Sequence, residues 1–356
     1  MTGRQHRLIL ASLTGVLVLE TCVGPSQPIA TAPGTTTSTT SLMGSGFHVS
    51  GNRILDPAGR PFTVKGADAV YGRFAGGDAN GLGRMNYQHA ERDLDGLQAA
   101  GFNLVRLSIS ADAAHLPPSS PDYIPYDQYL GELDRVVTWV TQRGMVAELS
   151  QGETAAPARI TALLMVLASR YGPNPLVWIK PDNEPNCEGG DQSKCTDWAL
   201  WQYQQSGYVR TLRGAGYTRP IVVNCIGWSW DCSQIPEFPL GDANLIYGAH
   251  RYGAGATTWD ASQGAEADRL WGDLARSVPV IVDEVGTQNP PVSPLTWSQG
   301  FLAYVTDWVH HRGGAGCIAF VDAWSDANTM TDPATGRWNR WGQTFIESYV
   351  KPVSRT

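Results

Sequence analysis

The sequence has no excess of basic residues. Its 26 Lys and Arg are outnumbered by 33 Asp and Glu, which gives a formal net charge of −7. This balance argues against a surface built for nucleic acid or for an anionic membrane. With 356 residues, the chain is long enough for one large domain or two small ones.

Two common motifs are also missing. No Gly-x-Gly-x-x-Gly follows the first expected strand, which argues against a doubly wound dinucleotide-binding sheet. The loop cysteines lack the tight Cys-x-x-Cys spacing of many zinc sites, so the zinc alternative is disfavoured.

We expect two local disulfides, Cys187 with Cys195 and Cys225 with Cys232, as in an oxidising compartment. Cys317 lies in an apolar run and is expected to be a buried free thiol.

The N-terminal apolar stretch is short. Residues 8–19 follow two arginines and fall below the roughly 20 residues that span a bilayer, so we interpret residues 1–22 as an export signal. A lipid anchor at Cys22 is an alternative to plain secretion, although Glu20 departs from the small residues that precede a lipoprotein cysteine. Residues 23–45 are rich in Thr and Ser and are expected to form a flexible tether.

Residues 46–356 carry the folded domain. Within it, short apolar runs alternate with helical patterns, after a predicted hairpin over 47–49 and 53–55 that would cover the bottom of the domain. The predicted strands are 63–67, 104–109, 146–149, 177–180, 221–226, 245–250, 280–284 and 317–324. The predicted helices are 87–100, 126–143, 158–170, 198–213, 261–276, 297–311 and 343–350, with only a weak helix over 231–244. This alternation predicts an α/β fold, a (β/α)8 TIM barrel.

Two glutamates follow buried-strand patterns. Glu184 comes just after the fourth predicted strand, and Glu284 ends the seventh. Carboxylates at the C-terminal ends of barrel strands are what glycoside hydrolysis requires, because one carboxyl protonates the leaving oxygen and the other attacks the sugar or activates water. A lone glutamate would be interpreted as an ion-paired or solvated residue, but the pair favours catalysis.

Other polar and aromatic side chains occupy the remaining strand ends. They are Arg106 on the second strand, Asn183 beside Glu184, His250 and Tyr252 on the sixth, and Trp324 on the eighth. We expect them to converge with the two glutamates. Asp283 and Asp322 are expected to point away from the centre or beside it, and we assign them no role.

These motifs resemble glycoside hydrolase family 5, a family of retaining (β/α)8 glycosidases. The resemblance extends from about residue 46 to residue 349. It rests on the stretches 51–61 and 101–107, on Asn183-Glu184-Pro185, on His250-Arg251-Tyr252, on Glu284-Val285-Gly286 and on Trp324.

The resemblance implies a role for each matching residue. Glu184 would be the acid/base and Glu284 the nucleophile of a double displacement. Arg106 and Tyr252 would hydrogen-bond the nucleophile and favour its charged form.

Substrate contacts follow from the same resemblance. Asn183 would hold the sugar 2-hydroxyl, His250 would position the acid/base, and Trp324 would form the stacking floor under the attacked sugar. Trp228 and Trp230, on the Cys225–Cys232 loop, are a candidate platform for further sugar units, or one of them plugs the barrel rim.

One departure from the family pattern concerns the third strand. Family members usually end this strand with a His, whereas this chain has Ser150 and Gln151 there. Either side chain can hydrogen-bond a sugar hydroxyl, so the departure affects the preferred sugar.

The expected function is a secreted, monomeric endo-β-1,4-glucanase that cleaves a β-linked oligo- or polysaccharide without metal or cofactor. A β-mannanase, an exo-acting β-glycosidase and a non-catalytic glycan-binding barrel remain alternatives.

Overall fold

The computed structural model describes residues 46–69, 90–120, 123–152, 155–185, 195–287, 295–322, 328–332 and 335–351. The predicted export signal and tether, Cys22, Cys187 and Trp324 lie outside these residues. Within the described ranges, no helix combines the length and the apolar character needed to cross a membrane.

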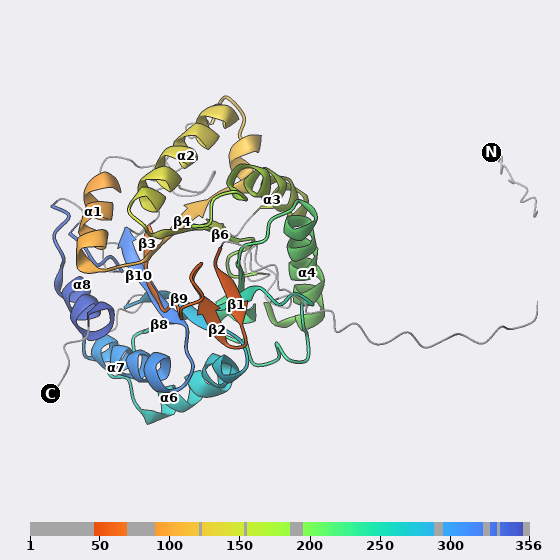
Figure 1. Cartoon of the computed structure of the whole chain (residues 1–356). Helices are drawn as coiled ribbons and strands as arrows, with labels where there is room; N and C mark the ends of the chain where they lie inside the picture. Colours follow the sequence, from red (N-terminus) through yellow and green to blue (C-terminus); the bar gives the residue numbers. More distant parts are fainter. Residues whose placement is uncertain are drawn as a thin grey trace, which may run out of the picture. The chain divides into compact units, whose positions relative to one another are not determined.

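Eight parallel strands close into a barrel, in the order β10-β3-β4-β5-β6-β7-β8-β9. Figure 1 views the barrel with its strands at the centre and its helices around them. The (β/α)8 prediction is therefore confirmed. The strands are β3 (Val64–Ala69), β4 (Leu104–Ile109), β5 (Val146–Gln151), β6 (Val177–Lys180), β7 (Ile221–Asn224), β8 (Leu245–Tyr252), β9 (Val280–Gly286) and β10 (Gly316–Asp322).

The helices return the chain from one strand to the next. α4 begins where the Asp197 carboxylate accepts a hydrogen bond from the Leu200 N–H at 2.9 Å, which satisfies an otherwise unpaired helix donor. The longer helices are α1 (Ala90–Ala100), α2 (Tyr126–Gln142), α3 (Pro157–Tyr171), α4 (Trp198–Gly214), α6 (Ala261–Ala267), α7 (Leu295–His311) and α8 (Arg340–Phe345). Shorter turns are η1 (Ala111–His115), α5 (Ile226–Ser229), η3 (Asp268–Gly272), η4 (Asp273–Arg276) and η5 (Ile346–Val350).

An apolar layer fills the barrel at the N-terminal ends of the strands. The hairpin of β1 (His48–Ser50) and β2 (Arg53–Leu55) lies across the barrel opening in Figure 1 and adds Phe47 and Ile54 to this layer. The Phe47 and Trp178 rings meet edge to face at 5.4 Å. We call this layer the floor; it contains Phe47, Ile54, Val64, Leu104, Val146, Trp178, Val222, Ile246, Ile281, Ala315 and Ile318.

The barrel interior becomes polar two residues further along the strands. Side chains two residues apart share one face of a strand. The polar residues therefore also point into the barrel, and they lie nearer the C-terminal ends of the strands than the floor does. We call this set the polar layer; it consists of Arg106, Glu148, Lys180, Asn224 and Asp283, all buried. It supports the strand ends at which the two glutamates lie.

Candidate active site

Glu284 is held by two hydrogen-bond donors. Nη1 of Arg106 donates to its Oε2 at 2.6 Å, and the Tyr252 hydroxyl donates to its Oε1. Burial, followed by the charge of Glu284, raises the pKa of Tyr252 well above its usual value, so the phenol keeps its proton and remains a donor. The two donors fix the orientation of the Glu284 carboxylate.

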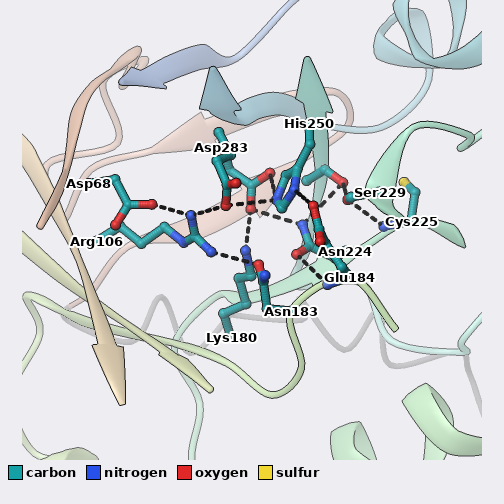
Figure 2. A network of polar contacts seen from close by, with 12 residues as sticks. Asp68, Arg106, Lys180, Asn183, Glu184, Asn224, Cys225, Ser229, His250 and Asp283 are labelled. Atoms are coloured by element: carbon teal, nitrogen blue, oxygen red, sulfur yellow. Dashed lines mark hydrogen bonds and ion pairs between the residues drawn. The ribbon is translucent and has the colours of Figure 1, made fainter. Parts of the chain in front are cut away.

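Arg106 joins several groups of the site. Its Nη2 donates to Oδ1 of Asn183 at 2.6 Å, which orients that amide. Its Nη1 also contacts Asp68, on β3 (Figure 2). Asp68 was missed by the sequence analysis because the predicted first strand ended one residue earlier, at Ala67. Burial raises the pKa of Asp68 to about 7, against the opposing effect of Arg106.

Glu184 lies just past the end of β6 in an uncommon backbone conformation. Its φ is +47°, in the left-handed region that costs a non-glycine residue roughly 1–3 kcal/mol. The Glu184 N–H donates to Oδ1 of Asn224 at 3.4 Å, which helps to hold this conformation. The side chain remains 14% exposed, so it can reach solvent or substrate.

His250 connects the two glutamates. Its Nδ1 lies 2.6 Å from Oε1 of Glu184, and its Nε2 lies 3.6 Å from Oε2 of Glu284. One carboxylate oxygen from each glutamate and one His250 nitrogen all lie within 4.8 Å of one another. Burial lowers the pKa of His250 well below its usual value, so the ring is neutral.

These three residues are also the group, among the described residues, whose spacing suits a metal ion. However, the Arg106 guanidinium already contacts Glu284 at 2.6 Å. A cation would be repelled by that fixed positive charge. The arrangement therefore favours an ion-paired carboxylate over a metal ligand.

A buried ion pair lies beneath His250. Nζ of Lys180 is 2.8 Å from Oδ2 of Asp283, and neither side chain is exposed. Asp283 was expected to point away from the centre or beside it; the first alternative is wrong, because Asp283 contacts Lys180 and Asn224 and lies next to His250. A register shift in the β8–β9 pairing, between Ala249 and His250, turns Asp283 and the adjacent Glu284 toward the barrel interior together.

The loop after β7 is closed by the predicted Cys225–Cys232 disulfide, whose Cα atoms lie 5.0 Å apart. This pairing is confirmed. Trp228, at φ +53°, is 40% exposed, whereas Trp230 is packed near Tyr252 and has the Arg251 guanidinium 4.6 Å from its ring centroid.

The other cysteines are placed less completely. Cys195 is disulfide-bonded, but its expected partner Cys187 lies outside the described residues. Cys317 is buried and free, as predicted.

The two residues of the strand-three departure lie in different surroundings. Ser150 is buried and, two residues beyond inward-facing Glu148, points into the barrel. Oε1 of Gln151 accepts a hydrogen bond from the Ala111 N–H at 2.7 Å, and its amide nitrogen donates to the Gly152 carbonyl. Gln151 therefore anchors the η1 turn through backbone contacts.

Residues 55–311 match the family model for cellulase (glycosyl hydrolase family 5). The chain belongs to this family. It is therefore a glycoside hydrolase of a retaining family that acts on O-glycosyl bonds.

Two relatives of this chain have names that give different substrates. A mannan endo-1,4-β-mannosidase from Streptomyces lividans is 20% identical over 332 residues, covering 87% of this chain and 76% of the relative. A cellulase from a Thermoanaerobacterium species is 27% identical over 214 residues, covering 53% of this chain and 54% of the relative.

Solved structures of both kinds share the fold. A β-glucanase from Saccharophagus degradans, in complex with cellotetraose, has a TM-score of 0.69 at 22% identity and covers 85% of this chain and 92% of its own. A mannotriose complex of Thermomonospora fusca β-mannanase has a TM-score of 0.63 at 17% identity, covering 86% and 96%.

Proposed function

We propose that this family 5 enzyme is an endo-β-1,4-glucanase, with Glu184 as acid/base and Glu284 as nucleophile. The observation that carries the two catalytic roles is the approach of the two carboxylates. Their nearest oxygens lie within 4.8 Å, which suits the separation of about 5–5.5 Å between the carboxyl groups of retaining enzymes and leaves no room for the water of an inverting one.

In the first step, an oxygen of Glu284 attacks the anomeric carbon while Glu184 gives its proton to the glycosidic oxygen. The bond to the leaving sugar breaks, and a covalent glycosyl–enzyme ester forms. The contacts from Arg106 and Tyr252 support this assignment because they orient the Glu284 oxygens.

In the second step, Glu184 removes a proton from water as the water attacks the same anomeric carbon. The ester bond to Glu284 breaks and the nucleophile is released as a carboxylate. The hydrogen bond from Arg106 to Asn183 supports a role for that amide at the sugar 2-hydroxyl, because it fixes the amide plane.

A β-mannanase is the second candidate for the substrate. It is favoured by the Streptomyces lividans mannosidase, which aligns with 87% of this chain. The β-glucanase bound to cellotetraose, with a TM-score of 0.69, favours glucan. Both candidates use the same two carboxylates, so they differ in the surrounding sugar contacts.

We also propose that the enzyme is exported, either free or lipid-anchored at Cys22. The charged and apolar pattern of residues 1–22 and the Thr- and Ser-rich stretch that follows support export. Mass spectrometry of the mature N-terminus separates the two forms, since a lipoprotein would begin at an acylated Cys22.

The test of function is a screen of purified protein on glucan, mannan and xylan polymers and on aryl glycosides, with product lengths measured. We expect early release of mixed oligosaccharides from β-1,4-glucan. Release of one short product alone would indicate exo action, and preference for mannan would select the second candidate. Binding without any product would indicate a non-catalytic barrel.

A further inference from the structure

The Lys180–Asp283 ion pair is unused by the proposed mechanism, yet it is fully buried directly beneath the site. Oδ2 of Asp283 accepts hydrogen bonds from Nζ of Lys180 at 2.8 Å and from the Asn224 amide at 2.9 Å. Its other oxygen, Oδ1, lies 3.4 Å from Nε2 of His250. Figure 2 shows His250 between Asp283 on one side and Glu184 on the other.

The barrel backbone makes room for this arrangement at Gly248. A Cβ atom at Gly248 would lie 2.5 Å from both Oδ2 of Asp283 and the Asn224 amide nitrogen. Any side chain on β8 at this point would displace the carboxylate. The Asp283 position is therefore fixed by packing as well as by its ion pair.

The environment of His250 determines which ring nitrogen carries hydrogen. Its Nε2 lies near the carboxylates of Asp283 and Glu284, at 3.4 and 3.6 Å. Neither contact has hydrogen-bond geometry, so the two carboxylates act on the ring through their charge. A bare Nε2 lone pair this close to two carboxylates is unfavourable, which favours the hydrogen of the neutral ring on Nε2. Nδ1 is then an acceptor, and the 2.6 Å contact to Glu184 must be donated by a protonated Glu184.

We propose that Lys180 and Asp283 are positioning residues for the acid/base: Asp283, anchored by Lys180, holds the His250 hydrogen on Nε2, so that Nδ1 keeps the catalytic proton on Glu184. This inference rests on the proposed function. Rotation of the terminal carboxyl bond, a soft torsion, presents that proton to the glycosidic oxygen. After transfer, the Glu184 carboxylate faces the Nδ1 lone pair, which favours recovery of a proton from water.

The charges around the ion pair agree with this assignment. Burial raises the pKa of Asp283, but Lys180, His250 and Arg106 together outweigh burial and hold the pKa below its usual value, so the carboxylate is ionised. His250 is neutral because burial outweighs the influence of Asp283. The charged and titratable groups that face Asp283 and His250 are Asp68, Arg106, Glu148, Lys180, Glu184, Glu284 and Cys317.

The test compares two aryl β-glycosides of the preferred sugar, one with a good leaving group (2,4-dinitrophenol) and one with a poor leaving group (phenol). Only the poor leaving group needs protonation by Glu184. Asp283→Asn should therefore lower kcat/KM for the phenyl glycoside by up to about 100-fold, the low end of general acid catalysis. It should barely change kcat/KM for the dinitrophenyl glycoside.

The pH profile gives a second readout. Without the Asp283 charge, His250 can carry its hydrogen on Nδ1 and stabilise ionised Glu184. The alkaline limb of kcat/KM for the phenyl glycoside should then move to lower pH. Histidine-selective ¹⁵N NMR of the wild type should show hydrogen on Nε2 of His250, and hydrogen on Nδ1 would overturn the proposal.

Two further variants keep the proposal falsifiable. Lys180→Met combined with Asp283→Asn avoids an unpaired buried lysine and should show the same dependence on leaving group; a return to wild-type behaviour would overturn the proposal. Glu148→Gln is the matched control, since it also removes a buried carboxyl near Lys180, and it should affect both substrates equally.

Equal losses on both substrates with Asp283→Asn would indicate a purely structural pair. A wild type inactive on both would instead refute the proposed function.

Discussion

The floor and the polar layer of the barrel are built by the same strands, but the floor is apolar and the polar layer carries charged and amide side chains. On five strands, an apolar floor residue is followed two positions later by a polar one, about 6.6 Å further along the strand. The pairs are Leu104 and Arg106, Val146 and Glu148, Trp178 and Lys180, Val222 and Asn224, and Ile281 and Asp283. The barrel thus changes from a packed core to a charged network within one step of the pleat.

This difference separates stability from chemistry. The floor buries aromatic and branched side chains, which stabilise the fold in proportion to the apolar area removed from water. The polar layer buries charges that are costly to desolvate and therefore need partners. Both of its cations have carboxylate partners: Arg106 contacts Asp68 and Glu284, and Lys180 contacts Asp283. The polar layer therefore contributes less to the stability of the fold than the floor does, and its ion pairs hold the side chains of the site in fixed positions.

The largest expected effect is on chemistry alone. Glu284→Ala should lower kcat by on the order of 10⁴–10⁶-fold, as the loss of other nucleophiles does, while the unfolding midpoint stays close to that of the wild type. Kinetics on an activated aryl glycoside and thermal unfolding measure both. Azide should accelerate the corresponding Glu184→Ala enzyme on that substrate but not Glu284→Gln in the same manner. Substantial residual turnover by Glu284→Ala would remove it from the nucleophile role.

The floor should show the opposite response. Trp178 is fully buried, with Phe47 and Phe62 at 5.4 and 5.9 Å, so Trp178→Ala should lower the free energy of unfolding by about 3–5 kcal/mol. Activity of the folded fraction should persist at low temperature. Denaturant titration and kinetics at the same temperature measure the two effects.

Trp228→Ala is the matched control for the floor, because this tryptophan is 40% exposed on the disulfide loop. Its stability should change by no more than about 0.5 kcal/mol, whereas KM for long oligosaccharides should rise. If Trp178→Ala destabilised the protein no more than Trp228→Ala does, the floor would not stabilise the fold as a packed core.

Glu148 can be used to test how much the polar layer lowers the free energy of unfolding. Burial raises the pKa of Glu148 to about 8, and neither of its carboxyl oxygens has a hydrogen-bond partner among the described residues. Between pH 4.5 and 8 the folded state therefore holds a proton that the unfolded state releases, so wild-type stability falls as pH rises through this window. Glu148→Gln removes that slope and should be more stable at pH 8 by about 1–3 kcal/mol.

The measurement is denaturant unfolding of both proteins at pH 5, 6.5 and 8. The advantage of Glu148→Gln should grow with pH. An advantage that is constant or shrinks with pH would show that Glu148 is already ionised in the folded protein.

The sequence predicts the strands that form the floor well, but it predicts the side chains of the polar layer poorly. The strand runs were found because buried parallel strands are nearly continuous apolar segments, and the predicted 104–109 and 177–180 agree with β4 and β6. The polar layer was largely missed. No role was expected for Lys180. Asp283 was expected to point away from the centre or beside it, because pleat alternation does not reveal the β8–β9 register shift.

The two carboxylates that we propose as catalytic were easier to predict because they lie at or just beyond the ends of strand patterns. Asn224 was missed for another reason: its role depends on Glu184, 40 residues earlier, whose N–H it accepts. Such contacts depend on barrel closure, which local patterns do not encode. The helical pattern over 261–276 likewise gave no sign that α6 continues through η3 and η4 in place of one regular helix.

The smallest expected effect concerns sugar preference at the end of β5, the third barrel strand along the chain, just beyond the polar layer. Ser150 points into the barrel from β5, whereas the Gln151 amide is bonded to the backbone of Ala111 and Gly152. A hydrogen bond from Ser150 to a hydroxyl of the attacked sugar is worth about 0.5–1.5 kcal/mol. Ser150→Ala should therefore change the ratio of kcat/KM on gluco- and manno-configured substrates by about 2- to 12-fold, with little change in stability. Gln151→Ala should loosen the η1 turn and lower stability while leaving the ratio near that of the wild type. If Ser150→Ala keeps the parent ratio, the preference must come from the Trp228 and Trp230 loop; if Gln151→Ala changes it, the strand end contacts the sugar through the amide.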